Sequence, residues 1–71
     1  MKPSETLKRL RQQINATQHT DATAYQFIAN MRTMINTTLL LHKEGHCSDE
    51  GVELIVSSIQ HQLQFFKRLF P

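Results

Sequence analysis

Four residues near the middle of the chain carry side chains that bind metals or act as nucleophiles. These residues are His42, His46, Cys47 and Asp49, and zinc accepts ligands of all three types. His42 and His46 have the i, i+4 spacing of one helix face, but Gly45 between them is expected to end the helix. No second ligand pair follows a typical motif. We therefore expect a polar turn here and no metal site, with a zinc site in this turn as the open alternative.

No pattern of catalytic residues accompanies these side chains. A cysteine nucleophile needs a base and a group that orients the base, and only His46 lies beside Cys47. No glycine-rich phosphate loop exists, and the serines and histidines form no triad pattern with supporting motifs. We therefore expect the chain not to be an enzyme and to use no cofactor.

The size of the chain limits it to a single small domain over residues 1–71. With one cysteine, the chain forms no internal disulfide. A domain this small buries little apolar surface, and it usually needs a staple or a partner. Self-association or a partner protein is the remaining source of stability.

Charge and hydropathy exclude two classes of partner. The net charge is +2 and the basic residues are dispersed, so no nucleic-acid surface is indicated. No apolar run reaches the roughly 20 residues that span a bilayer, so no membrane insertion is expected. The N-terminal residues lack the apolar segment of a secretory signal. We expect a cytoplasmic protein.

The spacing of apolar residues and helix breakers predicts an all-α fold: an antiparallel helical hairpin with a short N-terminal helix. The expected helices cover about 4–16, 21–43 and 49–69. Apolar residues recur at steps of three and four in each, but the weak helix formers around 16–21 interrupt the first region. One continuous helix over 4–43 is the alternative.

Short signals mark the expected helix ends. Thr20 or Asp21 suits the N-cap of the second helix, and Ser48 suits that of the third. Gly45 suits the left-handed residue after the second helix.

Both long helices carry more apolar surface than a two-helix contact can bury. The main stripes hold Ala24, Ile28, Met31, Ile35 and Leu39, and then Val52, Ile55, Val56, Ile59, Leu63, Phe66 and Phe70. Beside them lie six further apolar residues: Phe27, Met34, Leu41, Leu54, Phe65 and Leu69. Each one left in water forgoes about 1.5–3 kcal/mol of burial. We predict that these six bind a partner, with Phe65 and Leu69 in contact and Phe66 in the core.

The N-terminal helix offers another way to cover this surplus. Leu7, Leu10 and Ile14 form its apolar face and could fold back over the second stripes. The N-terminal helix and a partner could each cover part of this surface.

The turn and the last helix resemble a known family. Gly45-His46-Cys47-Ser48-Asp49, followed by an amphipathic helix that ends in Gln64-Phe65-Phe66-Lys67-Arg68-Leu69, is similar to the small E-type co-chaperones of type III secretion needle subunits. The similarity covers about residues 20–70 and includes the length and the two-helix architecture. It implies a partner that is a helical-repeat chaperone, and a joint role in keeping the needle subunit soluble and monomeric.

A different class of protein also fits this pattern. A self-associating helical-bundle regulator, homodimeric and modulating nucleic-acid binding, would bury the same stripes against a second copy. The dispersed basic residues favour the co-chaperone.

Overall fold

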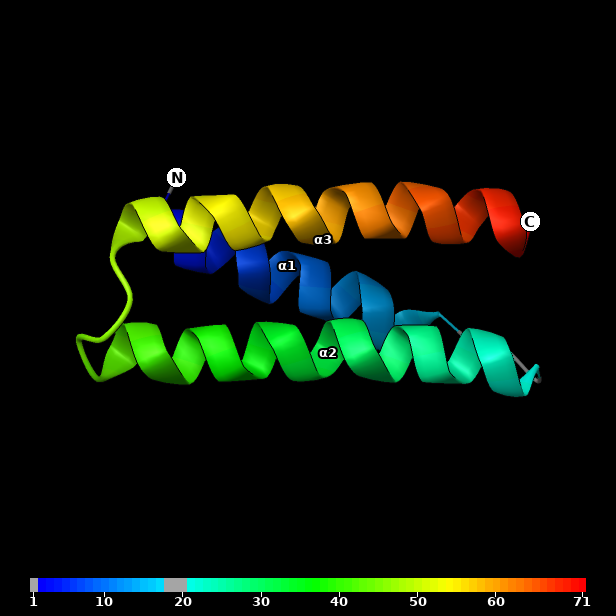
Figure 1. The fold of residues 1–71 in the computed structure, drawn as a ribbon, viewed down its shortest axis with the longest axis horizontal. Helices are drawn as coiled ribbons and strands as arrows, with labels where there is room; N and C mark the ends of the chain where they lie inside the picture. Colours follow the sequence, from blue (N-terminus) through cyan, green and yellow to red (C-terminus); the bar gives the residue numbers. More distant parts are fainter. Residues whose placement is uncertain (1, 18–20) are drawn as a thin grey trace.

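Three helices make up the chain in a computed structural model that describes residues 2–17 and 21–71 (Figure 1). Helix α1 spans Pro3–Ala16, α2 spans Ala22–Lys43 and α3 spans Asp49–Leu69. The described residues contain no strand. The all-α hairpin with a short N-terminal helix is therefore confirmed, with each boundary within one residue of the expected position.

The break between the first two helices is real. Thr17 has φ −80° and ψ 124°, and Asp21 has φ −74° and ψ 130°, so both are extended. Helix α1 thus ends at Ala16, and the continuous-helix alternative is wrong. Asp21 caps α2 because its Oδ1 accepts a hydrogen bond from the Ala24 N–H at 3.0 Å. The other candidate cap, Thr20, lies outside the described residues.

The turn between α2 and α3 is fixed by local hydrogen bonds. Gly45 has φ +80°, its N–H donates to the His42 carbonyl at 3.1 Å, and the His46 N–H donates to the Leu41 carbonyl at 2.8 Å. These two bonds form a Schellman motif, which ends α2. Ser48 then starts α3, since its Oγ accepts from the Gly51 N–H at 3.1 Å.

Helix α1 folds back and packs against both long helices. It runs antiparallel to α2, where the Arg11 Nη1 donates to the Asn36 Oδ1 at 2.8 Å, and parallel to α3, as Figure 1 shows. One core holds apolar residues from all three helices: Leu7, Leu10, Ile14, Ala24, Ile28, Met31, Ile35, Val52, Ile59, Leu63 and Phe66. The predicted core position of Phe66 is confirmed, with 2% of it exposed.

The short length of α1 explains where the aromatic residues lie. Fourteen residues span about 21 Å, against about 33 Å for the 22 residues of α2. Beyond the end of α1, the space between α2 and α3 is filled by phenylalanine rings. The Phe27 and Phe66 centroids are 5.7 Å apart, and the Phe66 and Phe70 centroids are 5.1 Å apart.

Candidate functional site: an apolar face on α2 and α3

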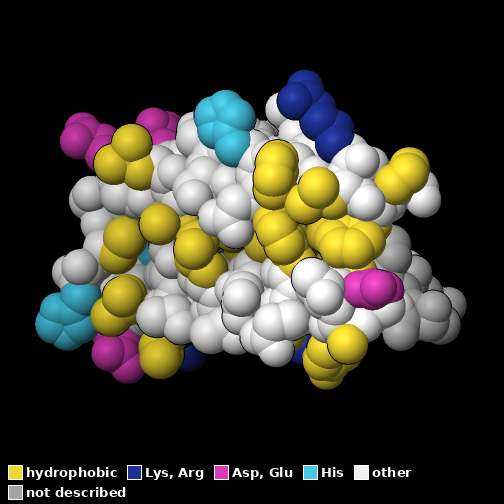
Figure 2. Space-filling view, turned by 45° about the vertical axis from the view of Figure 1, so that its right-hand side comes forward, with side chains coloured by type: hydrophobic (Ala, Val, Ile, Leu, Met, Phe, Trp, Pro, Cys, Tyr) yellow, Lys and Arg dark blue, Asp and Glu magenta, His cyan; other side chains and the backbone are white. Residues whose placement is uncertain are grey.

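The six residues predicted to bind a partner lie on one side of the hairpin. Seven-residue spacing puts Phe27, Met34 and Leu41 in one row along α2, and Leu54, Phe65 and Leu69 form a row along α3. We call these six residues the α2–α3 face. The two rows meet where the Phe27 and Phe65 rings lie 6.3 Å apart. Figure 2 shows a band of apolar side chains along this seam, densest toward the end of α3.

Helix α1 packs on the opposite side of both long helices. It contacts Asn36 of α2 and lines a groove together with Lys43. Each of these residues lies two positions after a residue of the α2–α3 face: Asn36 after Met34, and Lys43 after Leu41. It lines two further grooves, one with Val56 and one with Lys67 of α3. Val56 lies two positions after Leu54, and Lys67 two positions after Phe65. Side chains two positions apart point about 160° away from each other around a helix. Helix α1 therefore covers the main stripes and leaves the α2–α3 face open.

Exposure divides the six residues into two groups. Leu41, Leu54, Phe65 and Leu69 are exposed, at 41%, 73%, 53% and 51% of their surface. Phe27 and Met34 are half-buried and pack against the core. The alternative that α1 covers the surplus is thus wrong for these four side chains, because α1 packs on the main stripes instead.

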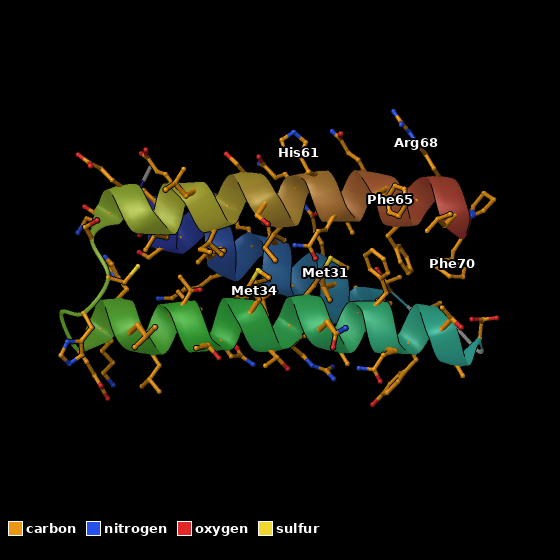
Figure 3. All side chains as sticks on the ribbon, viewed as in Figure 1. Met31, Met34, His61, Phe65, Arg68 and Phe70 are labelled. Atoms are coloured by element: carbon orange, nitrogen blue, oxygen red, sulfur yellow. The ribbon has the colours of Figure 1, made fainter. Side chains whose placement is uncertain are left out.

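The face contains one organised polar contact in its middle. The Gln62 Nε2 donates to the Ser58 Oγ at 3.0 Å and lies 3.9 Å from the Met34 Sδ. Figure 3 shows Met34 pointing from α2 toward α3, with Phe65 on the side of α3 that faces away from α1. This contact fixes the Gln62 side chain beside the seam.

Charged side chains surround the face but do not enter it. Between Ala22 and His42, α2 has one charged residue, Arg32, which lies about 160° around the helix from Met34. On α3, Glu53 is about 120° from Phe65, whereas Glu50 and Arg68 each lie about 40° from Leu54 around the helix, and Arg68 points away from α2 (Figure 3). The seam between the two rows is therefore apolar, with Glu50 and Arg68 at the outer edge of the α3 row.

The residues of the turn do not come together as a ligand set. The His42 Nε2 lies 2.8 Å from the Asp49 Oδ1, which joins the end of α2 to the start of α3. His46 is exposed, and the Cys47 Sγ lies 3.7 Å from the Ser48 carbonyl oxygen. Within residues 2–17 and 21–71, no three His, Cys, Asp or Glu side chains are placed to hold a metal ion.

Cys47 packs inward and leaves little space at the start of α3. It is half-buried and contacts the core. A Cβ atom at Gly51 would lie 3.0 Å from the Cys47 Sγ. Close approach of the Cys47 side chain thus explains a glycine inside the first turn of α3, where helix propensity disfavours it.

The sequence does not predict one feature of the surface. Lys8, Arg11 and Lys43 line an open groove between α1 and α2. Arg11 and Lys43 are 32 positions apart in the chain, so the sequence does not reveal this proximity. Only the antiparallel packing of α1 on α2 brings them together.

Compared with protein families, with curated proteins and with solved structures, the chain matches none of them. In the part of the chain that the structure describes, no helix has the length and hydropathy needed to cross a bilayer. Inferences about function therefore start from the α2–α3 face and from the resemblance at the turn and last helix.

Proposed function

We propose that this chain is a small protein-binding adaptor that docks an amphipathic helix of a partner on its α2–α3 face. One observation carries the proposal: Leu41, Leu54, Phe65 and Leu69 are exposed on one side of the hairpin, along an apolar seam. Exposed apolar patches of this kind mark interaction sites more often than inert surface. Two parallel rows of apolar side chains match the way a partner helix inserts between two others.

The length of the face suits a partner helix. The face runs the length of the hairpin, whose Cα atoms extend over 37 × 17 × 15 Å. A typical interface buries about 800 Å² per partner, and a face of this length and two-helix width offers an area of that order.

The resemblance to the small E-type co-chaperones adds a specific version of the proposal. In that version, the chain pairs with a helical-repeat chaperone in the cytoplasm and helps to keep a needle subunit monomeric. The mechanism would be masking, since apolar side chains on α2 and α3 would cover a surface that otherwise polymerises.

A second copy of the chain is the other candidate partner. The six residues of the face are uncharged, so a second copy meets them without like charges directly opposite each other, and two-fold pairing would bury both faces at once. This is the self-associating regulator, and the oligomeric state of the purified chain separates it from the adaptor.

The experiment compares the wild type with the double variant F65Q/L69Q. Each chain is expressed with an affinity tag in its native host and co-purified proteins are identified by mass spectrometry. We expect a helical-repeat chaperone and a needle subunit with the wild type and neither with F65Q/L69Q. The control is Y25Q, which removes an apolar side chain that is 60% exposed on another side of α2.

Sedimentation of the isolated chain completes the test. The adaptor should be monomeric or a mixture of weak oligomers, and its melting temperature should rise when the partner is added. A stable homodimer lost in F65Q/L69Q would favour the regulator instead. A wild type that is monomeric and binds the same proteins as F65Q/L69Q would contradict both.

A further inference from the structure

We infer that the groove between α1 and α2 is a second docking site, which takes a short acidic amphipathic helix from a partner protein. The groove has an open volume of about 420 Å³, and its lining includes Lys8, Arg11, Leu39, Leu40, His42 and Lys43. It lies on the side of α2 away from the α2–α3 face. Its assignment is therefore independent of the adaptor function proposed above.

Three cationic side chains converge on this groove from two helices. Lys8 and Arg11 are one turn apart on α1, and Lys43 approaches from the end of α2. Among residues 2–17 and 21–71, neither lysine makes an ion pair. The Arg11 guanidinium is held by the Asn36 amide oxygen at 2.8 Å, so this cation is already positioned over the groove.

Among the described residues that line the groove, none is an aspartate or a glutamate. Asp49 at the start of α3 is engaged, since its Oδ1 lies 2.8 Å from the His42 Nε2. The groove therefore keeps an excess of positive charge. The two grooves that α1 forms with α3 differ from it, since one holds Glu53 and the other holds Lys67 as its charged residue.

The floor of the groove favours a peptide over a nucleic acid. Leu40 is 56% exposed and Leu39 beside it is half-buried. A leucine side chain offers an apolar contact and no stacking platform for a base. A helix with leucines on one face and glutamates at its edges would bury Leu40 and place carboxylates near the three cations.

The size of the groove sets the length of its occupant. Ser4 and Arg11 mark its two ends on α1, about 11 Å apart along the helix. A helix of three turns covers that distance and has room for glutamates on both edges. The probe is therefore a fluorescein-labelled peptide of 15 residues with leucines at i, i+3 and i+7 and glutamates beside them.

The binding experiment uses the full chain and measures fluorescence anisotropy. We expect the glutamate peptide to bind at least tenfold more tightly than the same peptide with lysine in place of glutamate. The affinity should fall as salt is raised from 50 to 500 mM, because exposed charges are screened. K8Q/K43Q should weaken the glutamate peptide about threefold to tenfold, and L40Q should weaken it as well.

Two control variants make the location of the site testable. K67Q/R68Q removes two cations outside the groove, and F65Q/L69Q alters the α2–α3 face. Both should bind the glutamate peptide as the wild type does. Amide chemical shifts of the wild type should change around Lys8, Leu40 and Lys43 on peptide addition, and circular dichroism confirms that each variant is folded.

Several results would overturn the inference. They are equal affinity for the lysine peptide, equal weakening by K67Q/R68Q, loss of binding in F65Q/L69Q, or no binding of the glutamate peptide. Tighter binding of a DNA duplex of 20 base pairs, weakened by K8Q/K43Q, would assign the groove to nucleic acid instead.

Discussion

Two neighbouring phenylalanines allow a direct test of which apolar side chains belong to the core. Phe66 is 2% exposed and Phe65 is 53% exposed, although both lie on α3 and both rings contact Phe27. Replacing each with alanine removes the same atoms from different surroundings. The difference between the two losses of stability therefore reports mainly the difference in burial, with a smaller part from the ring contacts.

The expected magnitudes follow from the exposed fractions. Phe66→Ala should cost about 3–5 kcal/mol, the range for a fully buried phenylalanine. Phe65→Ala removes a side chain that is about half buried, so its transfer cost is about 1 kcal/mol. Loss of the ring contact with Phe27 raises the total to about 1–2 kcal/mol.

Urea unfolding followed by circular dichroism at 222 nm measures both losses. A chain of 71 residues has an unfolding free energy of about 4–10 kcal/mol, so Phe66→Ala should remove between about a third and all of it. Phe66→Leu and Phe65→Leu give the same ordering with smaller losses if the alanine variant does not fold. Leu54→Ala, at a residue 73% exposed, is the control and should cost about 0.5 kcal/mol or less.

Equal losses at Phe65 and Phe66 would refute this account of the core. The α2–α3 face would then lose its principal exposed anchor, since Phe65 would be acting as a core residue. Partner binding should show the opposite order: in variants that remain folded, replacing Phe65 should weaken binding more than replacing Phe66.

Other predictions concern the turn and the helix ends. Gly45→Ala should destabilise the chain by about 1 kcal/mol in urea unfolding, because Gly45 has φ +80°; an unchanged midpoint would contradict the Schellman motif. Gly51→Ala should gain about 0.5–1 kcal/mol when Cys47 is also replaced by alanine, and less when Cys47 is present, because the new Cβ would lie 3.0 Å from the Cys47 Sγ. A double-mutant cycle measures this coupling, and additive effects would exclude it. Asp21→Ala should cost about 1 kcal/mol through loss of the α2 cap, with Asp21→Ser as the control that restores capping.

The helix ends were predictable because their causes are local. The Gly45 backbone, the Ser48 hydroxyl and the Asp21 carboxylate each act on backbone groups within four residues in the chain. The same locality applies to the apolar stripes, whose spacing identified the buried positions on α2 and α3. The grouping of the six partner-binding candidates on one side of the hairpin also follows from helical periodicity.

The side of the hairpin on which α1 packs was not predictable from the sequence. Leu7, Leu10 and Ile14 form an apolar face that fits either side of the hairpin. The side depends on contacts between residues far apart in the chain, so only the packing of all three helices together determines it. The exposure of Phe65 and Leu69 is a consequence of that choice.

Sequence alone thus determined the helical type of the elements, most of their limits and the surplus of apolar surface, since these depend on periodicity and on capping within one turn. The break between α1 and α2, for which one continuous helix was the alternative, was decided by the structure. Tertiary structure alone decided which of the surplus apolar side chains remain exposed and which basic side chains lie close together. Helix α1 packs on one side of the hairpin, where it buries the main stripes and brings Lys8 and Arg11 to Lys43. The other side keeps its apolar strip because a helix of 14 residues has one apolar face and can bury only one side of the hairpin.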